Sequence, residues 1–417
     1  MEGSYKERRD SFYNQIDHFW DRLYGMEYAL YDYIPLSNRQ VAEVQQATQE
    51  AYSIFKKTNQ LVRLAEEETF IQLGVPKQTL SLLKKETISF ETVIGRFDFV
   101  DTKNGLKILE FNADTPTFIR EVFEVNGKVA NSFDCADPNE GEDEKIGENV
   151  RAAVNQLSDY LGLMEYPYVV FTAHKEDIED RETLNYLMKS AKIPGAAFIP
   201  LDELIVNTGE REAGVYDQDG KKIDIVYRHT YPLEALVRDQ TDDGYLIGEA
   251  FLQLVEHKKV GILNPPSAFL MQTKAMLAVI WGLHEANHPY FSDYDHQIIE
   301  TYFLPTYLDE EPFVETGEKY VSKPIFGREG DTVRIKEFGR VIGEETHNTY
   351  DEFIKVFQKY VELPTAVVNT ELGAKEMHLL IGSFVVGEKA SAFGFRAGAA
   401  ITDNLSYFLP CVVKGDT

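Results

Sequence analysis

Cysteine is almost absent from this sequence of 417 residues, which holds only Cys135 and Cys411. Two cysteines are too few for the disulfide framework that stabilises many small secreted domains. Long apolar runs are also absent, because the most apolar stretch, residues 268–281, includes Gln272 and Lys274 and is too short to span a bilayer. The first ten residues contain no apolar stretch of the kind that a signal peptide requires. These absences predict a cytoplasmic protein.

Basic residues are scarce relative to acidic ones. The chain has 42 lysines and arginines against 69 aspartates and glutamates, which gives a formal net charge of −27. A field of this sign repels phosphate backbones and anionic membrane surfaces, so neither nucleic acid nor a membrane is an expected partner. It attracts a cationic substrate such as a polyamine, although solubility alone also explains many of these charges.

The order of the expected elements predicts a mixed α/β (α+β) fold. A chain of this length is expected to form two or three packed lobes. Apolar residues recur at helical spacing before about residue 90, as at Tyr13, Ile16, Phe19, Trp20 and Leu23, and alternate as in strands from Thr92. Strands are expected at 168–172 and 223–227, helices around 184–188 and over 267–283, a surface loop over 134–149, and a strand-rich end from Tyr320.

The segment from Ile94 to Asn112 predicts two antiparallel strands around a three-residue turn, Lys103-Asn104-Gly105. Glycine at the last position of such a turn suits a left-handed backbone. This turn pairs Thr102 with Leu106, and the same register places Asp98 opposite Glu110 and Arg96 opposite Asn112. A two-residue Asn-Gly turn is an alternative, and it would shift the register by one residue and break these pairs.

Side chains alternate along a strand, so the two predicted pairs share one face of the hairpin. The other face carries Phe97, Phe99, Leu109 and Phe111, which can enter a core. Two carboxylates opposite each other repel, and a bound divalent cation would remove that penalty. Because Asp, Glu and Asn oxygens suit magnesium, this face is a candidate Mg²⁺ site. The alternative is a solvated strand face on which Arg96 neutralises one acid.

A glycine turn near the other end of the chain is a candidate phosphate site. Gly327-Arg328-Glu329-Gly330 lies between two strand-like runs, and Lys323 precedes it. Glycines let backbone N–H groups approach an anion closely, and the two cations would supply charge for phosphoryl oxygens. The turn is not a Walker A loop, because no Gly-Lys-Ser/Thr follows the glycines. An ordinary glycine hairpin is the alternative.

Two further cations stand in unusual surroundings. Lys274 interrupts an apolar run, so its side chain either extends to water or points into a polar cavity. Arg396 lies among small residues in Phe393-Gly-Phe-Arg-Ala-Gly-Ala-Ala-Ile-Thr-Asp-Asn404. An arginine in such a setting suits bidentate binding of a carboxylate or a phosphate. Tight packing between elements explains the glycines there but not the arginine.

The segment His284-Glu285-Ala286-Asn287-His288 matches the His-Glu-x-x-His pattern of zinc proteases. That chemistry needs both histidines on one face of a helix. Asn287 weakens the helix and Pro289 follows at once, so a helix terminus is the preferred interpretation of this segment.

Four motifs together resemble the glutathionylspermidine synthetase family, whose members have an ATP-grasp fold. In order, they are Gly95-Arg-Phe-Asp-Phe99, Leu109-Glu-Phe-Asn-Ala-Asp-Thr-Pro-Thr117, Ser322-Lys-Pro-Ile-Phe-Gly-Arg-Glu-Gly330 and Phe395-Arg-Ala-Gly-Ala-Ala-Ile-Thr-Asp-Asn404. The similarity extends from about residue 90 to the end. It implies ATP and Mg²⁺ as cofactors and an acid and an amine as small-molecule substrates.

The resemblance implies a role for each matching residue. Asp98, Glu110 and Asn112 are the implied magnesium ligands, and Arg96 and Arg328 the implied catalytic arginines, with Arg328 on the glycine loop that closes over the γ-phosphate. Thr115, Thr117 and Arg396 are implied to contact the acid or peptide-like substrate. The implied ATP-binding residues are Lys274, Lys323, Gly327, Arg328, Gly330, Gln358 and Tyr360.

The chain resembles the short branch of this family, which lacks the amidase domain. About 90 residues precede the first motif and none is a cysteine, so amide hydrolysis is not expected. The stretch 175–182 resembles the polyamine region only loosely, which leaves the amine open. Residues 1–90 are predicted to form a helical segment, 91–262 the metal-binding hairpin and substrate region, and 263–417 the nucleotide-binding region.

The predicted activity is an ATP-dependent acid–amine ligase that forms a C–N bond through an acyl phosphate. Glutathione or a peptide-like molecule is the candidate acid, and a polyamine is the candidate amine. The alternatives are an inactive ATP-binding regulatory module, an enzyme that stops at phosphoryl transfer, and the zinc protease. Substrate identity and oligomeric state do not follow from the sequence.

Overall fold

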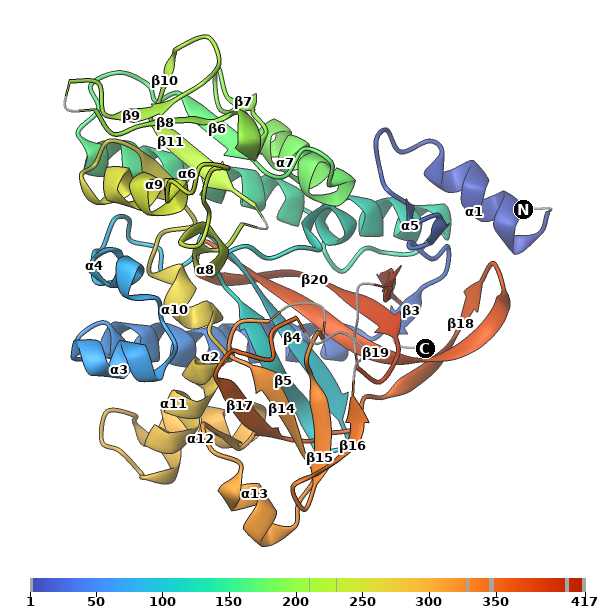
Figure 1. Ribbon diagram of the computed structural model, residues 1–417. Coiled ribbons are helices and arrows are strands. Elements are labelled where there is room, and N and C mark those ends of the chain that lie inside the picture. The colour runs from blue at the N-terminus through green and yellow to red at the C-terminus, as the bar shows by residue number, and fades with distance from the viewer. Residues whose placement is uncertain are drawn as a thin grey trace.

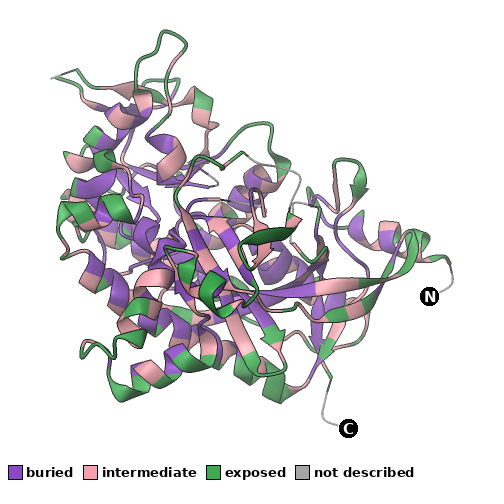
Figure 2. Ribbon diagram, turned by 60° about the horizontal axis from the view of Figure 1, so that its bottom comes forward, coloured by how far each residue is buried: buried purple, intermediate pink, exposed green. Residues whose placement is uncertain are grey.

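The computed structural model describes residues 3–209, 211–229, 231–327, 330–344, 349–401 and 405–414. Three regions are visible in Figure 1: a parallel sheet with its helices at the top, a long antiparallel sheet in the middle, and a second antiparallel sheet in front of it. Buried residues gather in the strands and on the inner faces of the helices (Figure 2). Within the described ranges, no helix has both the length and the apolar character needed to cross a membrane.

The central sheet has six antiparallel strands, in the order β21-β20-β19-β4-β5, with β18 pairing beside β19. Their bounds are β4 Ile94–Thr102, β5 Gly105–Asn112, β18 Thr365–Thr370, β19 Gly373–Val386, β20 Lys389–Gly398 and β21 Tyr407–Leu409. The sheet therefore joins the hairpin to the end of the chain and takes strands from both sides of residue 262. The three-segment division of the chain stays a prediction.

Helix α2 (Asn38–Val62) covers one face of this sheet. Ser37 caps its start, accepting a hydrogen bond from the Gln40 backbone while the Gln40 side chain accepts one from the Ser37 backbone. Phe55 packs edge-on against Phe97 and Phe111, at centroid distances of 5.4 and 5.0 Å. The predicted aromatic face of the hairpin is thus buried under this helix.

The hairpin turn is shorter than predicted, and a β-bulge restores the predicted pairing. Thr102 pairs with Gly105, which leaves two residues in the turn instead of three. In an unbroken ladder this register would put Leu109 opposite Asp98. One extra residue in β5 shifts the register, so that Asp98 pairs with Glu110 as predicted. The prediction that Leu109 enters the core was wrong, because Ile108 occupies the core in its place.

The second antiparallel sheet has the order β13-β17-β14-β15-β16 and carries the glycine turn after β14. Helix α11 packs against its strands β13 and β17, α12 packs between α11, α2 and β5, and α13 lies at the lower end of the sheet (Figure 1). The bounds are β13 Thr306–Tyr307, β14 Tyr320–Pro324, β15 Arg334–Glu337, β16 Arg340–Glu344, β17 Lys355–Lys359, α11 Ala275–Glu285, α12 Asp293–Tyr302 and α13 Glu311–Thr316.

The parallel sheet has the order β12-β11-β6-β7 and is buried on both faces. Alternate residues enter two different cores: Val169, Phe171 and Tyr227 face α6 and α7, whereas Val170 and Val226 pack with α9. The bounds are β6 Val169–Thr172, β7 Ala197–Phe198, β11 Ile225–Arg228, β12 Gly261–Leu263, α6 Glu142–Leu161, α7 Ile178–Ala191 and α9 Ile247–Glu256.

Shorter elements connect these sheets. They are α1 Tyr5–Tyr13, β1 Arg22–Leu23, β2 Met26–Glu27, β3 Ile34–Leu36, α3 Glu67–Gln72, α4 Leu80–Leu83, the π-helical turn η2 Glu121–Val125, α5 Asn126–Ser132, β8 Ile205–Asn207, β9 Gly214–Tyr216, β10 Lys222–Ile223, α8 Leu233–Leu236, α10 Ala268–Gln272 and β22 Cys411–Val413, with 3₁₀ turns at Lys77–Thr79 and Leu201–Glu203.

Three expectations about local structure were wrong in part. The helix expected across 13–23 ends at Tyr13, because the apolar residues that follow pack in turns and in the short strand β1. The loop expected over 134–149 ends early, since α6 begins at Glu142 with three acidic residues in its favourable first turn. The helix expected over 267–283 is broken at Thr273–Lys274 into α10 and α11.

Candidate active site

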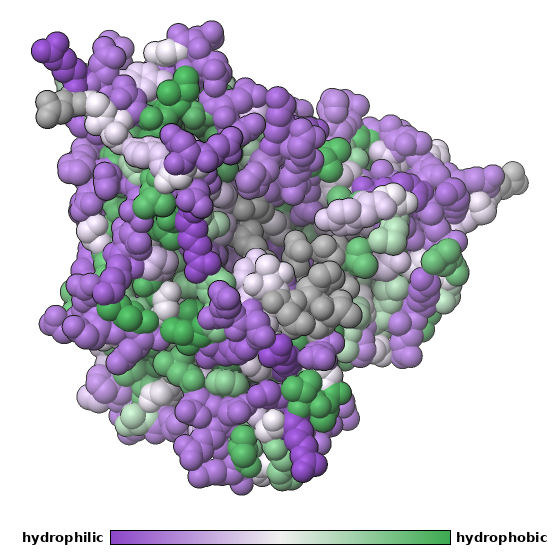
Figure 3. All heavy atoms as spheres, viewed as in Figure 1, coloured by the Kyte–Doolittle hydropathy of each residue, from purple (hydrophilic) through white to green (hydrophobic). Residues whose placement is uncertain are grey.

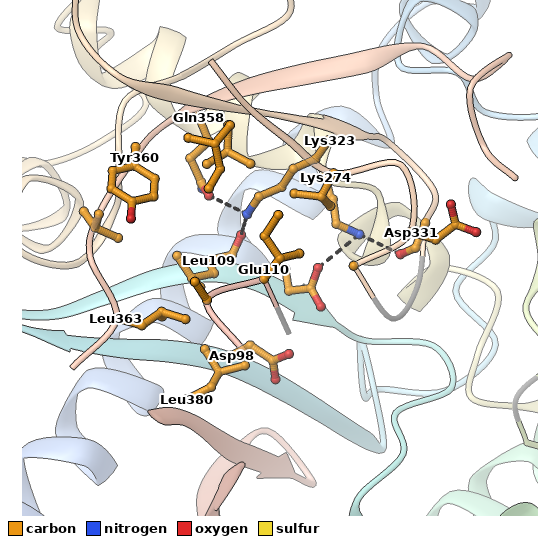
Figure 4. Close-up of a pocket in the computed structure, with 18 of the residues that line it drawn as sticks. Asp98, Leu109, Glu110, Lys274, Lys323, Asp331, Gln358, Tyr360, Leu363 and Leu380 are labelled. Carbon is orange, nitrogen blue, oxygen red and sulfur yellow. Dashed lines mark hydrogen bonds and ion pairs between the residues drawn. The ribbon is translucent and has the colours of Figure 1, made fainter. Parts of the chain in front are cut away.

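A cleft of about 920 Å³, open solvent at its mouth included, lies where the central sheet faces the second antiparallel sheet. The hairpin forms its floor with Asp98, Leu109 and Glu110, and the opposite wall comes from β14, β15 and β17. Figure 4 shows that the side chains of Lys323 and Gln358 reach into it from that wall, and that Lys274 reaches into it from the break between α10 and α11. Segments that are far apart in the sequence therefore meet at this one place.

An acidic strip lies along the hairpin. Asp98 accepts two hydrogen bonds from Arg96, 2.7 Å from Nε to Oδ1 and 3.1 Å from Nη2 to Oδ2. Opposite it, Glu110 accepts a hydrogen bond from Asn112 Nδ2 at 3.1 Å and forms an ion pair with Lys274 Nζ at 3.1 Å. Each carboxylate is thus paired with a cation, which offsets the repulsion between the two acids.

The surroundings shift the pKa values of the two acids in opposite directions. Burial raises the pKa of Asp98 above its ordinary value; the Arg96 charge opposes this and the Glu110 charge adds to it. Burial alone would also raise the pKa of Glu110, but the charges of Lys274 and Lys323 lower it below its ordinary value. Glu110 is therefore the acid that stays ionised most firmly.

Two lysines converge on the cleft from different elements. Lys274 stands at the break between α10 and α11, and its Nζ donates to the Gly327 carbonyl at 2.9 Å. It therefore points into a polar cavity instead of extending to water. Lys323 on β14 donates to Gln358 Oε1 at 2.8 Å and to the Leu109 carbonyl at 3.4 Å. The bulge in β5 places that carbonyl beside the lysine.

Burial lowers the pKa of Lys323 to about 8; the charge of Glu110 opposes this shift and that of Lys274 adds to it. Two cations that point at one cavity repel each other and are costly to bury without anions. The arrangement favours an anionic ligand that contacts both.

The far end of the cleft is less polar. Tyr360, Leu363 and Leu380 line it, whereas the lysines and Asp331 lie at the other end (Figure 4). The cleft therefore offers a charged end and an apolar, aromatic end. Such a division suits a ligand that carries phosphates on one side and a flat ring on the other.

The structure places the other predicted residues as follows. Gly327, Gly330, Gln358, Tyr360 and Arg396 line the cleft, while Arg328 lies outside the described residues. Arg96 and Asn112 lie on the same face of the hairpin as the acidic strip. Neither they nor Thr115 and Thr117 line the cleft in the described structure.

Arg96 connects the strip to the predicted substrate residues. Its Nη1 donates to the carbonyl of Thr117 at 2.8 Å and to Oγ1 of Thr117 at 3.2 Å. The Thr115 backbone N–H, two residues earlier, donates to Gln272 Oε1 at 3.4 Å. A guanidinium held in this way cannot move without disturbing both Asp98 and the chain at Thr117.

Sequence reasoning missed two acids beyond Arg96 and Arg396, of which Glu121 is buried and Glu179 is half-buried. Tyr28 donates to Glu121 Oε1 at 2.5 Å, and burial raises the pKa of Glu121 above its ordinary value. Burial also raises the pKa of Glu179 well above its ordinary value, and the charge of Glu121 adds to this. Neither glutamate stands in a pattern that differs from an ordinary helix terminus, so only the packing reveals this group.

The zinc-protease interpretation is wrong. Helix α11 ends at Glu285, and Asn287 has a positive φ of 47°, so His284 and His288 do not share a helical face. His284 contacts His296 instead, with 3.0 Å between the two Nδ1 atoms. Within the described parts of the chain, no three His, Cys, Asp or Glu side chains gather closely enough to hold a metal. The hairpin triad has two such side chains, Asp98 and Glu110, and its third member is Asn112.

The sequence is similar to one protein family and to several known proteins. A family model described as glutathionylspermidine synthase preATP-grasp matches residues 6–414. A Haemophilus influenzae protein named "Putative acid–amine ligase" is 26% identical over 332 residues, which are 76% of this chain and 73% of the relative. The bifunctional glutathionylspermidine synthetase/amidase of Escherichia coli is 22% identical over 359 residues, 80% of this chain. The match covers 52% of that relative, so this chain spans about half of its length.

A solved structure shows the same fold. The apo form of a glutathione synthetase-like effector from Globodera pallida matches 99% of this chain and 98% of its own, with a TM-score of 0.56 and 14% identity. The predicted mixed α/β class and ATP-grasp fold are confirmed.

Proposed function

This chain belongs to the glutathionylspermidine synthase family, and we propose that it is an ATP- and Mg²⁺-dependent ligase that joins a carboxylic acid to an amine. The convergence of Asp98, Glu110, Lys274 and Lys323 on one cleft carries this proposal. Carboxylates next to lysines are what a metal-bound polyphosphate requires, because the acids hold the cation and the lysines hold the phosphates.

In this proposal the nucleotide lies along the cleft. Lys274 and Lys323 contact phosphate oxygens, and the backbone of Gly327 and Gly330 approaches the phosphates closely. The adenine lies at the other end, beside Gln358 and Tyr360. Support comes from the division of the cleft into a charged end and an apolar end.

The donor chemistry of the hairpin fits Mg²⁺. Asp98, Glu110 and Asn112 offer carboxylate and amide oxygens from one face of two paired strands, which are the hard ligands that magnesium prefers. Asp98 forms an ion pair with Arg96, and Glu110 forms one with Lys274. Each carboxylate must therefore bind the metal ion while it also interacts with its cationic partner. When bound, the metal would neutralise phosphate oxygens during transfer.

The proposed reaction has two steps. The substrate carboxylate takes the γ-phosphoryl group of ATP, and the amine then displaces phosphate from the acyl phosphate to leave an amide. Arg96, which Asp98 and Thr117 hold by hydrogen bonds, would stabilise negative charge that develops on the acyl oxygens. Arg328 would neutralise the transferred phosphoryl group; this role rests on the sequence alone.

The substrates are proposed to meet beyond the γ-phosphate end of the cleft. Arg396 and the chain around Thr115 and Thr117 would bind the carboxylate-bearing substrate. Glu121 and Glu179 form an acidic pair close to Arg96 and Arg396, as their mutual charge interactions indicate. An amine that entered there would meet carboxylates able to accept its protons.

A coupled assay tests the proposal. The protein is incubated with ATP, Mg²⁺ and a panel of acids, with and without polyamines, and ADP is measured. A ligase releases ADP at full rate only when acid and amine are both present. ADP formed with the acid alone would indicate phosphoryl transfer without ligation, and nucleotide binding without any ADP would indicate a regulatory module.

A pair of variants ties the activity to the cleft. Lys323→Met should lose nucleotide binding, because one of the two converging charges is removed. Lys319→Met on the exposed surface just before the same strand should bind nucleotide as the natural protein does. Equal binding by both variants would contradict the assignment of the cleft.

A further inference from the structure

A second pocket lies at the carboxyl ends of β6 and β11, on the face of the parallel sheet turned away from α6 and α7. It is a hollow of about 470 Å³, open solvent at its mouth included. Ligands of open α/β sheets commonly bind at the carboxyl ends of parallel strands. Its walls are mostly aliphatic, from Leu204 and Val206 on one side and Leu236, Ile247 and Phe251 on the other.

Two polar side chains at the base of this pocket are incompletely satisfied. Arg228 and Thr172 are paired in the register of β11 and β6, so they lie side by side on one face. Both are almost completely buried, with 2% and 0% of their surface exposed. Arg228 Nε and Thr172 Oγ1 have no hydrogen-bond partner among the described residues. Buried polar atoms normally find partners, so these two indicate a missing ligand or water.

The charge of Arg228 is already balanced. Its Nη1 and Nη2 donate to the two oxygens of Asp114, and Nη1 also donates to the Tyr231 carbonyl. A further anion would therefore add an unpaired negative charge, and Asp239 on the pocket wall would repel it. Within the described part of the chain, Arg228 Nε therefore still lacks one neutral hydrogen-bond acceptor, and the Thr172 hydroxyl still lacks one hydrogen-bond partner.

We propose that this pocket binds a small neutral aliphatic amide or a peptide group with an aliphatic side chain. The amide oxygen accepts from Arg228 Nε, and the amide N–H donates to Thr172 Oγ1. The alkyl part packs against Leu204, Leu236 and Phe251, where apolar burial provides most of the affinity. The site is distinct from the cleft of the lysines, since the two share no lining residue.

The experiment uses isobutyramide as the probe with the full chain, measured by saturation-transfer NMR and calorimetry. A fragment of this size should bind with a dissociation constant on the order of 1 mM. Isobutyrate, the anion of the same shape, should bind at least about tenfold more weakly. An ATP analogue should not displace the amide. This result would show that the amide site is separate from the proposed nucleotide cleft, and it does not depend on whether the proposed ligase function is correct.

Two matched variants locate the site. Thr172→Val keeps the shape, removes one hydrogen bond and should weaken isobutyramide binding by about three- to tenfold. Its unfolding midpoint should not fall, because the hydroxyl it removes has no partner in the structure. Thr183→Val removes another buried hydroxyl without a described partner, on α7, and should leave probe binding unchanged.

Three results would overturn the proposal. The first is the absence of saturable binding, with ordered water as the only occupant of the pocket in a crystal soaked with the amide. The second is equal affinity of Thr172→Val and the natural protein for the probe. The third is displacement of the amide by the ATP analogue.

Discussion

At the scale of single residues, the cleft contains acidic and basic side chains from different elements that shift one another's pKa values. Lys323 has a pKa of about 8 because it is buried, and Glu110 is held ionised by the lysines that face it. Such mutual shifts occur where ligands or reactions need a defined charge state. They also make the affinity of the cleft for a charged ligand dependent on pH.

Nucleotide affinity should fall as pH rises through about 8. Phosphate binds the protonated form of Lys323, and this form is lost above the lowered pKa, so binding above pH 8 must also take up a proton. Calorimetry between pH 7 and pH 9.5 should show the loss. Lys323→Arg keeps its charge over this range, so its affinity should be nearly flat with pH; an equal slope in both proteins would assign the effect to another group.

Asp98→Asn should both destabilise the protein and raise its magnesium requirement. Arg96 would remain buried with a neutral partner, which costs about 3 kcal/mol in the free energy of unfolding. Denaturant unfolding measures the first effect, and a Mg²⁺ titration of nucleotide binding measures the second. Asp101→Asn, exposed on the same strand, is the control and should change neither. An unchanged titration in Asp98→Asn would remove this residue from the metal site.

At the scale of elements, one bulge decides what the hairpin presents to the cleft. The extra residue, Leu109, moves to the cleft side, and its carbonyl accepts a hydrogen bond from Lys323. On the other side, Phe97 and Phe111 stack at 3.9 Å between ring centroids under α2. The helix thus supports the strip of charged residues from behind, and the geometry of the cleft depends on this packing.

Phe55→Ala should lower the free energy of unfolding by about 3–5 kcal/mol. Phe55 is 1% exposed and contacts both stacked rings, so its truncation leaves a cavity between α2 and the central sheet. Denaturant unfolding measures the loss. Gln46→Ala, exposed on the same helix, should stay within about 0.5 kcal/mol of the natural protein. A loss of comparable size in both would mean that the packing of Phe55 is not responsible.

At the scale of the whole molecule, a net charge of −27 surrounds a cleft that is proposed to bind both ATP and an amine. Most of the face shown in Figure 3 is hydrophilic, with apolar side chains in several separate places among the polar ones. The global field therefore attracts the amine and repels the nucleotide. The local lysines must overcome that repulsion at the cleft itself.

Salt should act on the two substrates in opposite directions. Between about 20 mM and about 300 mM ionic strength, the KM for a polyamine should rise several-fold, while the KM for ATP should fall or stay level. Steady-state kinetics with one substrate varied at a time measures both. A neutral osmolyte at matched osmolarity should leave both values unchanged. A parallel rise of the two constants would show that the global field does not guide the substrates.

The sequence alone determined the α/β class and the aromatic face of the hairpin, because both follow from the alternation of apolar residues, which is a local property. It also predicted that Asp98 pairs with Glu110, although through a three-residue turn in place of which the structure has a two-residue turn and a bulge. Only the tertiary structure decided that Lys274 meets Glu110, that a bulge and a two-residue turn stand in place of a longer turn, and that Glu121 and Glu179 come close together. The physical reason is that these contacts join segments far apart in the chain. Their geometry is set by how two sheets and a broken helix pack, and no short pattern records that packing.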